Sequence, residues 1–243
     1  MADWVFMADA HLREWDFHGQ TRIVRFLERE KRNLGTLVIL GDLFEFWFGF
    51  EPFAFEGYRP VLDKLRELAG AGVRIRYVEG NHDFNLGSYV RERLKAEVCP
   101  EHCVVDLDGK RVYMAHGDLV NGDERFYRVF RRILRSPFTY WLIQRAGPRI
   151  CKRAASLLGS VSGGKGSNKN PERIEALFRR FAVEKLREGF DVVILAHNHL
   201  PQACMFEVDG REAQYFNVGD WVNHFSYVRY RPGRGFAIEY CPG

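Results

Sequence analysis

Five strand-like stretches of this chain each end in a short cluster of polar residues. The stretches are WVFMA (4–8), TLVIL (36–40), VRIRYVE (73–79), VYMA (112–115) and VVILA (192–196). The clusters that follow them are Asp9-Ala10-His11, Gly41-Asp42, Gly80-Asn81-His82-Asp83, His116-Gly117-Asp118 and His197-Asn198-His199. In an open α/β sheet, the carboxyl ends of the strands converge on one crevice. We therefore expect polar side chains from distant parts of the chain to become neighbours there.

The elements between these stretches predict an α/β fold. Helix-like segments at 19–33 and 57–70 alternate with the first three strands, which is typical of parallel strands with helices on the sheet faces. Runs at 213–218, 225–231 and 235–240, with a turn at Asp209-Gly210, predict antiparallel strands. A chain of 243 residues is long enough for one well-buried domain with an insertion. We expect a single domain over 1–243.

Aspartate, asparagine and histidine side chains converging on one crevice predict a metal site with enough ligands for two ions. Two divalent cations about 4 Å apart repel by on the order of 16 kcal/mol at an effective dielectric of 20. Asp42, in the middle of the ligand order, suits the role of the anion that bridges them. Imidazole, carboxylate and amide ligands favour Mn, Fe or Zn over Ca. Such a site is cationic and attracts phosphate.

The stretch around Asp42, GDLFEFWFGF (41–50), combines carboxylates with aromatic residues. Two readings are open for Phe44, Phe46, Trp47 and Phe48: they form a wall of the cleft, or they pack as core beside a turn. Glu45 is expected either to orient a metal ligand or to lie on the surface.

The segment at 122–170 predicts a helical insertion with a strongly basic composition. Eleven of the 36 Lys and Arg residues, and no Asp or Glu, lie between residues 125 and 171, so 25 basic residues face 32 acidic ones elsewhere. FYRVFRRILR, YWLIQRA and RICKRAASLL mix apolar and cationic residues, SVSGGKGSNKN is typical of a flexible loop, and Asn170-Pro171 predicts the start of a helix to about Glu188. Basic amphipathic helices bind anionic membrane surfaces. Two alternatives stay open: helices packed on the core with solvated arginines, and a nucleic-acid surface.

The cysteines and the amino-terminal stretch predict a cytoplasmic protein. The five cysteines form no CxxC pair and are odd in number, so we expect reduced, mostly structural thiols. A zinc site at Cys99, His102 and Cys103 is disfavoured because no second ligand pair is apparent. MADWVFMADAHL lacks the features of a signal peptide, and no apolar run is long enough for a membrane span.

Taken together, the five clusters resemble the motifs of the calcineurin-like metallophosphoesterase superfamily. The resemblance spans almost the whole chain and implies a two-sheet αββα core with a helical cap insertion. It implies a first metal held by Asp9, His11, Asp42 and His199, and a second held by Asp42, Asn81, His116 and His197. A hydroxide between the metals would attack phosphorus. His82 would contact the phosphoryl oxygen or protonate the leaving group, and Asp83 would tune it.

A narrower resemblance is to the UDP-2,3-diacylglucosamine hydrolases of lipid A biosynthesis. It rests on GDLFEFWFG (41–49), GNHDF (80–84), HGDLVNGDERFYR (116–128) and FNVGDWV (216–222). It implies a manganese-dependent hydrolase, bound peripherally to the cytoplasmic face of the inner membrane. This enzyme would cleave the pyrophosphate bond of UDP-2,3-diacylglucosamine at the α-phosphate, giving UMP and 2,3-diacylglucosamine 1-phosphate (lipid X), while the cap clasps the acyl chains. The substrate contacts would be Asn81, His82, Asp123, Glu124, Ser162, Lys169 and His197. No protein partner is indicated.

The sequence departs from that narrower pattern at three places. His82 stands where much of the family has arginine, Asn198 replaces the threonine of GHTH, and Glu124 replaces an aspartate. All the predicted metal ligands survive these changes, which argues against a catalytically silent scaffold. The departures bear on the identity of the substrate rather than on the metal site. The alternative function is that of a metal-dependent phosphodiesterase or nuclease acting on nucleotides or nucleic acid.

Overall fold

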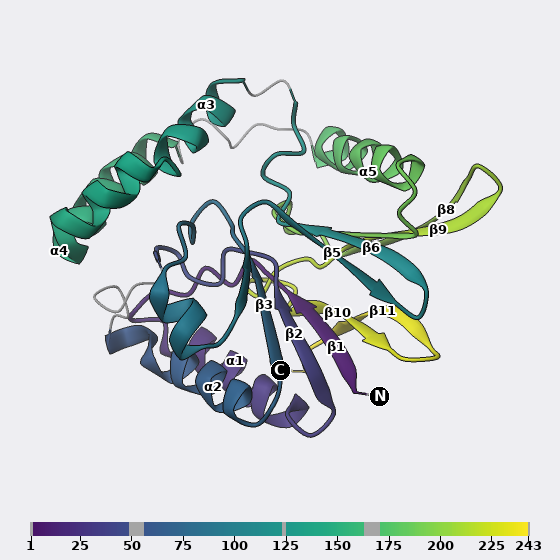
Figure 1. Cartoon of the computed structure of the whole chain (residues 1–243), viewed down its shortest axis with the longest axis horizontal. Helices are drawn as coiled ribbons and strands as arrows, with labels where there is room; N and C mark the ends of the chain where they lie inside the picture. The colour runs from purple at the N-terminus through teal and green to yellow at the C-terminus, as the bar shows by residue number, and fades with distance from the viewer. Residues whose placement is uncertain (1, 49–55, 123–124, 163–170, 243) are drawn as a thin grey trace.

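Two β-sheets lie face to face between layers of helices in the computed structural model (Figure 1). The structure describes residues 2–48, 56–122, 125–162 and 171–242, and it leaves out the side chains of 152–162. The first sheet has the order β11-β10-β1-β2-β3-β4 and the second the order β5-β6-β7-β9-β8. This arrangement confirms the α/β class and the two-sheet core. The assignment of 1–243 as one domain stays a prediction.

The first sheet is parallel at its centre. Its strands are β1 (Asp3–Met7), β2 (Leu34–Ile39), β3 (Arg74–Val78), β4 (Glu97–Cys99), β10 (Ser226–Arg231) and β11 (Gly235–Tyr240). Strands β1 to β4 run parallel, whereas β10 pairs antiparallel with both β1 and β11. The runs predicted at 225–231 and 235–240 are therefore antiparallel to each other and complete the amino-terminal sheet, whereas the run predicted at 213–218 lies in the second sheet.

The second sheet combines parallel and antiparallel pairs. Its strands are β5 (His102–Leu107), β6 (Lys110–Ala115), β7 (Val192–Leu195), β8 (Gln202–Val208) and β9 (Arg211–Asn217). Strand β7 runs parallel to both β6 and β9, and β8 forms an antiparallel hairpin with β9 through the turn at Asp209-Gly210. The carboxyl ends of β6, β7 and β9 therefore point the same way.

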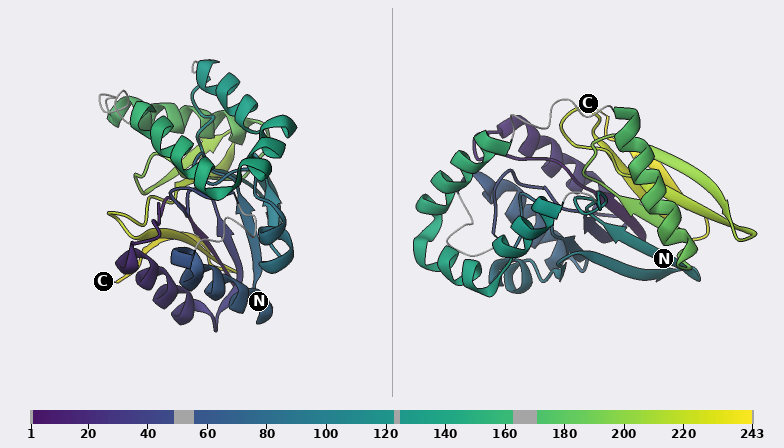
Figure 2. Two further views of the ribbon diagram at one scale, coloured as in Figure 1. Left: turned by 90° about the vertical axis from the view of Figure 1, so that its left-hand side faces the viewer. Right: turned by 90° about the horizontal axis from the view of Figure 1, so that it is seen from above.

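Helices cover the outer face of each sheet. Helices α1 (Phe17–Glu30) and α2 (Arg59–Gly70), with the short turns η2 (Glu56–Tyr58) and η3 (Tyr89–Arg93), pack on the first sheet, and α5 (Pro171–Arg187) packs on the second (Figure 2). The Asp16 side chain accepts the Gly19 N–H at 2.9 Å and thereby caps α1. Helix α5 begins at Pro171, as the sequence predicts.

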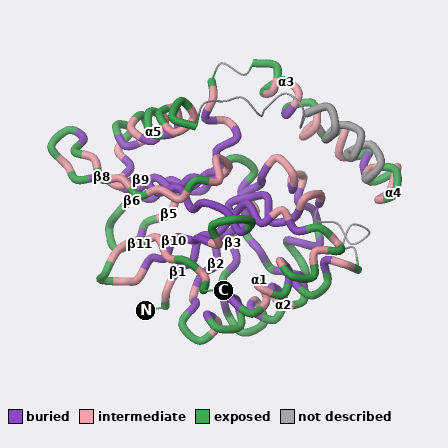
Figure 3. The backbone as a smooth tube through the Cα atoms, turned by 180° about the vertical axis from the view of Figure 1, so that it is seen from behind, coloured by how far each residue is buried: buried purple, intermediate pink, exposed green. Residues whose placement is uncertain are grey.

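The alternation of side chains along β1 shows how the layers are held together. Val5 and Met7 belong to the core under α1 and α2, whereas Trp4, Phe6 and Ala8 belong to the core between the sheets. Successive residues of a strand point to opposite faces, so a strand buried on both faces is apolar throughout. Burial is concentrated in the sheets, as Figure 3 shows.

The predicted insertion contains two helices. Helix α3 (Arg125–Leu134) is followed by α4 (Pro137–Ser162), which is broken at Gly147 before Pro148. We call residues 125–162 the cap; it lies beyond the carboxyl ends of β2 and β3, apart from α1 and α2 (Figure 1). The Gly/Ser loop expected next falls largely outside the described residues. Among the described helices, none has the length and apolar character needed to cross a bilayer.

Cys99 and Cys103 form a disulfide in the structure. The prediction that all the cysteines are reduced is therefore wrong for this pair, whereas Cys151, Cys204 and Cys241 are free. The physical reason is the short turn between β4 and β5, which brings the two Cα atoms to 5.8 Å, within the usual range for a disulfide.

Candidate metal centre

The predicted ligands meet at the carboxyl ends of strands from both sheets. Asp9 and His11 follow β1, Asp42 follows β2, Asn81 follows β3, His116 follows β6, and His197 and His199 follow β7. The convergence was predicted for one sheet, whereas the second sheet supplies three of the side chains. The stacking of the sheets brings the two sets of strand ends together.

The first group of ligand atoms surrounds Asp9. The Asp9 Oδ1 atom lies 3.8 Å from both His11 Nε2 and His199 Nε2, and His11 Nε2 lies 3.9 Å from Asp42 Oδ2. Among the described residues, Asp9 Oδ1 has no hydrogen-bond partner although it is buried. A buried carboxylate oxygen without a partner is costly. A cation between these four side chains would remove that cost, so the residues fit a metal ion.

The second group surrounds His116. Its Nε2 atom lies 3.4 Å from Asp42 Oδ2, 3.0 Å from Asn81 Oδ1 and 3.1 Å from His197 Nδ1. Nitrogen and oxygen ligands about 2.1 Å from one ion lie roughly 3.0 to 3.4 Å apart in octahedral or tetrahedral geometry. The spacing therefore fits a second cation, and Asp42 Oδ2 belongs to both groups.

The pKa values show that this site demands positive charge. Burial alone would raise the pKa of Asp42, but the contact with His116 holds it well below its ordinary range. Burial would lower the pKa of His116, yet the Asp42 carboxylate raises it to about 10. Burial and the neighbouring His116 lower the pKa of His197 to about 4. The buried Asp42 carboxylate thus favours positive charge at its neighbours.

Three of the histidines are oriented through the ring nitrogen that faces away from the cluster. The contacts join His11 Nδ1 to Glu45 Oε2 at 3.2 Å, His199 Nδ1 to Asp220 Oδ2 at 3.3 Å, and His116 Nδ1 to the Leu40 carbonyl at 2.7 Å. Such contacts fix the tautomer and leave Nε2 for a metal. The expectation that Glu45 orients a ligand agrees with this geometry.

Asp220 is a residue that the sequence reasoning missed. It is fully buried, and its Oδ1 accepts the backbone N–H groups of residues 222–224 at 2.8 to 3.2 Å while Oδ2 faces His199. His224 Nδ1 also lies 3.4 Å from Oδ2. The signal was present, because Gly219-Asp220 follows β9 in the same way that the other polar clusters follow their strands.

Five of the predicted ligands have left-handed backbone conformations. Their φ angles lie between 44° and 71°, at Asp9, His11, Asp42, His197 and His199. Non-glycine residues adopt this region only at a cost of about 1 to 3 kcal/mol each, and such residues concentrate at functional sites. Backbone strain at these five residues is therefore the cost of directing their side chains toward one point.

His82 and Asp83 have different surroundings. The His82 backbone N–H donates to Asp42 Oδ1 at 2.9 Å and its Nδ1 lies 3.0 Å from the Glu45 carbonyl, which leaves Nε2 to engage a substrate. Asp83 accepts four hydrogen bonds: from the N–H groups of Asp42, Leu43 and Gly80, and from the Tyr77 hydroxyl. Burial, followed by the Asp42 charge, raises the pKa of Asp83 to about 7. Asp83 thus holds the ligand loops together, and these four bonds, rather than a contact to the His82 ring, occupy its carboxylate.

The aromatic residues after Asp42 form part of the core. Phe44 and Trp47 are completely buried beneath α1 and α2, and Phe48 joins them. The Leu12 N–H donates to the Leu43 carbonyl, and the Trp47 N–H donates to the His82 carbonyl. These backbone hydrogen bonds connect this stretch to the loops that carry the other ligands. Of the two open readings, the structure supports core packing, which fixes this stretch against the loops that carry the metal ligands.

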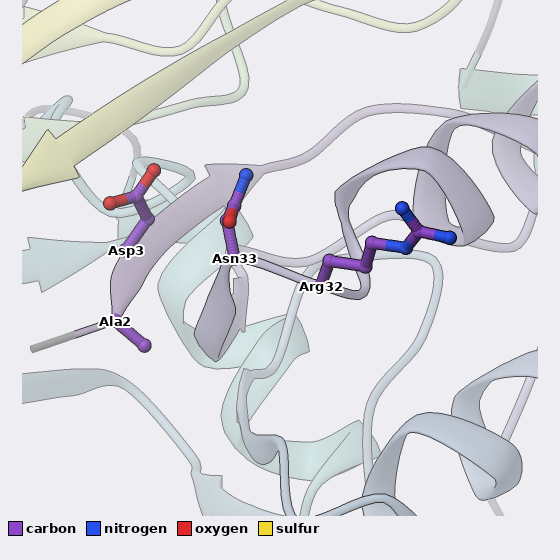
Figure 4. Close-up of a pocket in the computed structure, with 4 residues that line it drawn as sticks. All are labelled: Ala2, Asp3, Arg32 and Asn33. Atoms are coloured by element: carbon purple, nitrogen blue, oxygen red, sulfur yellow. The ribbon is translucent and has the colours of Figure 1, made fainter.

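Part of the predicted substrate set cannot be placed. Asn81, His82 and His197 lie at the cluster, whereas Asp123, Glu124 and Lys169 fall outside the described residues, as does the side chain of Ser162. A surface pocket of about 360 Å³ is lined by Ala2, Asp3, Arg32 and Asn33 (Figure 4). It lies at the amino ends of β1 and β2, away from the ligand cluster, and contains no predicted site residue.

A family model for the calcineurin-like phosphoesterase superfamily domain matches residues 4–137. This chain belongs to that superfamily. Among curated proteins, it is 32% identical to a UDP-2,3-diacylglucosamine hydrolase from Aeromonas salmonicida over 94% of this chain and 90% of the relative. It is 31% identical to the hydrolase of the same name from Aeromonas hydrophila, over 94% and 95%. Among solved structures, it is similar to an archaeal phosphodiesterase, with a TM-score of 0.48, 13% identity and 98% of each chain covered. The superfamily and the donor set together make this protein a metal-dependent phosphoesterase.

Proposed function

We propose that this phosphoesterase holds two divalent cations and hydrolyses UDP-2,3-diacylglucosamine at the α-phosphate. Water is consumed, and the products are UMP and 2,3-diacylglucosamine 1-phosphate (lipid X). The observation that carries the proposal is the convergence of two groups of ligand atoms on Asp42 Oδ2, beside the buried Asp9 oxygen that accepts no hydrogen bond from the described residues. The relatives that carry this activity in their name, at about 30% identity over most of the chain, support the substrate.

The residues have distinct roles in this proposal. The cations, when bound, supply Lewis-acid activation of water and neutralise phosphate charge. Asp42 would help to hold both cations through Oδ2, while its Oδ1 accepts the His82 N–H. His82, held through Nδ1 by the Glu45 carbonyl, presents Nε2 to the phosphoryl group or the leaving oxygen. We propose manganese as the metal; it is one of the ions, with iron and zinc, that imidazole, carboxylate and amide ligands favour.

We also propose that the cap contacts the lipid and the cytoplasmic face of the membrane. Large apolar side chains of the cap are exposed, led by Phe126, Phe138 and Ile150. Arg145 and Arg149 are exposed nearby in α4, and Arg145 lies over the Trp141 ring. Apolar side chains beside cations favour an anionic lipid surface. The expected arginine rim is smaller than the sequence suggests, because Arg131 and Arg135 are largely buried.

The deciding experiment incubates the purified chain with UDP-2,3-diacylglucosamine and Mn²⁺, and measures UMP and the lipid monophosphate. We expect both products in equal amounts, with no turnover in EDTA. The His82→Ala variant should lose most of the rate while keeping its metal content. Cleavage of a single-stranded oligonucleotide with no release of UMP would instead support the nuclease.

Membrane binding is tested separately by flotation with vesicles that contain an anionic phospholipid. Replacing Phe126 and Phe138 with serine should reduce the floated fraction and spare the hydrolysis of a small phosphodiester. Unchanged flotation would exclude this face of the cap as the membrane contact.

A further inference from the structure

The guanidinium of Arg135 connects the cap to the loop that carries Asn81 and His82. Its Nη2 donates to the Gly80 carbonyl at 2.8 Å, and its Nη1 lies 2.7 Å from Glu79 Oε2. The guanidinium also lies over the Phe84 ring, 5.7 Å from the centroid. The side chain is only 12% exposed, so these bonds are well shielded from water. An arginine at the end of α3 therefore contacts residues on both sides of Asn81.

The Gly80 carbonyl belongs to the peptide bond that leads into Asn81. Because a peptide unit is planar, a bond to this oxygen fixes the plane from which the Asn81 side chain departs. On its other side the loop packs closely against Asp42: a Cβ atom on Gly80 would lie 2.0 Å from Asp42 Oδ1. The Gly80 N–H is held by Asp83 Oδ1 at 3.1 Å. Arg135 thus holds the loop through the Gly80 carbonyl, on the side of the loop that faces the cap.

Other contacts also fasten the cap but do not reach this peptide. Asn85 Nδ2 donates to the Leu134 carbonyl at the end of α3, at 3.0 Å. Arg131 Nε lies 2.8 Å from Asp118 Oδ2, and Arg135 itself donates to the Pro100 carbonyl at 2.5 Å. The structure therefore separates contacts that only seat the cap from the one that also holds the Gly80–Asn81 peptide.

We propose that Arg135 is a positioning residue through which the seated cap fixes Asn81 and His82. The inference rests on the proposed hydrolysis at this metal centre. It implies that the cap acts on the chemistry itself, so a small phosphodiester without acyl chains also depends on Arg135. Arginine suits the role because its planar fork reaches the Glu79 carboxylate and the Gly80 carbonyl together, whereas lysine provides a single point charge.

The test measures kcat and KM for bis(p-nitrophenyl) phosphate with saturating Mn²⁺. Arg135→Met should lower kcat by about 10- to 100-fold, the usual effect of removing a partner that orients a metal ligand, with KM within about twofold. Arg135→Lys should recover part of the loss because it retains the pair with Glu79. Arg125→Met, an exposed arginine of the same helix, should match the wild type.

Asn85→Gly separates positioning from cap seating. Glycine accepts the φ of +52° at this position, so the variant removes the bond to Leu134 and leaves the Gly80 carbonyl untouched. It should keep kcat within about threefold of the wild type, an allowance of under 1 kcal/mol. Equal losses in Asn85→Gly and Arg135→Met, or full activity in Arg135→Met, would overturn the inference.

The folded fraction of each variant is checked by its melting temperature. If Arg135→Met does not fold, Arg135→Lys decides: a kcat equal to the wild type would refute the proposed role, and a reduced kcat at constant KM would support it. If the wild-type protein cleaves only UDP-2,3-diacylglucosamine, the same variants are compared on that substrate. A wild-type protein inactive on both substrates would refute the metal-centre function, and this outcome is distinct from a failure of the Arg135 role.

Discussion

At the scale of single residues, the site is built before any ion arrives. The Asp9, His11, Asp42 and His199 side chains are aimed by left-handed backbone conformations, and their free oxygens and nitrogens face one another. Asp42 is the one side chain shared by both groups. Removing any ligand therefore leaves the remaining charges unbalanced, and Asp42 should have the largest effect.

Replacing Asp42 with alanine should remove both ions together. A metal supplies several kcal/mol of transition-state stabilisation, so its loss should lower turnover by about a thousandfold or more. Metal content measured by mass spectrometry should fall from about two ions per chain to below one. Asp63→Ala, which removes an exposed carboxylate on α2, is the matched control. An Asp42→Ala protein that keeps two ions and normal turnover would rule out the shared carboxylate.

Replacing Asp220 with asparagine should weaken the metal site selectively. Asparagine keeps an oxygen for the N–H groups of residues 222–224, but it removes the negative charge that faces His199 Nδ1. Loss of such a partner typically lowers metal affinity by about 10- to 100-fold. Calorimetric titration of the metal-free protein with Mn²⁺ measures the change, and Asp209→Asn in the exposed β8–β9 turn is the control. An affinity within twofold of the wild type would show that Asp220 only shapes the turn.

The ligands themselves were predictable because each follows an apolar strand, and this pattern can be recognised in the amino-acid sequence. Asp220 obeys the same rule, but it follows a strand assigned to the antiparallel carboxyl-terminal part of the chain, so it was not assigned. The role of Asp83 was not predictable. Its four hydrogen bonds come from Tyr77 and from loops after two different strands, and only the folded chain brings them together. The left-handed conformations likewise depend on tertiary contacts.

At the scale of elements, the break in α4 permits the cap to turn. Gly147 has φ 74° and ψ 170°, a conformation that is essentially restricted to glycine, and Pro148 follows. Space is available, because nothing lies within 4 Å of a Cβ atom built there. Any cost of substitution must therefore come from the backbone.

Gly147→Ala should accordingly loosen the cap, by about 1 to 3 kcal/mol of local stability. Hydrogen exchange should speed up in α4 and leave the sheets unchanged. Gly70→Ala is the control, since Gly70 also has open space but lies at the end of α2 without a positive φ. Unchanged exchange in α4 would mean that the break is not required for the seated cap.

The central strands were predicted within a few residues, whereas β4, β5 and β8 were missed. The central ones are apolar along their length because both faces are buried. The missed ones are the edge strands β4, β5 and β8, where short length or alternating exposure leaves a weak signal. Their presence is decided by the partner strand rather than by their own composition.

At the scale of the whole molecule, Arg229 on β10 ties the two ends of the chain together. It is buried and pairs with Asp3 on β1, Glu30 on α1 and Glu239 on β11, at 2.6 to 3.1 Å. Removing one partner of a buried pair typically costs about 3 to 5 kcal/mol. Arg229→Met should reduce the free energy of unfolding by that amount, measured with urea at pH 7.

The loss of unfolding free energy in Arg229→Met should become smaller at acidic pH. Burial would raise the pKa of Glu239, but its bonds to Arg229 and Arg231 hold the pKa below the ordinary 4.5, so its contribution is present above that value and disappears as the pH falls further. Arg231→Met, which removes a more exposed arginine from the same cluster, should cost about 1 kcal/mol or less. An equal decrease in the free energy of unfolding for the two variants would contradict the larger contribution of the buried Arg229.

The pairing of β1 with β10 sets an order of events during synthesis. Asp9 and His11 are synthesised before their companion His199, which follows almost two hundred residues later, and before β10, whose Tyr230 pairs with Trp4 of β1 more than two hundred residues along the chain. Each candidate ion needs donors from both the early and the late portions of the chain. Neither candidate ion site therefore has its full set of donors until the late portion of the chain has been synthesised and has paired with the early one.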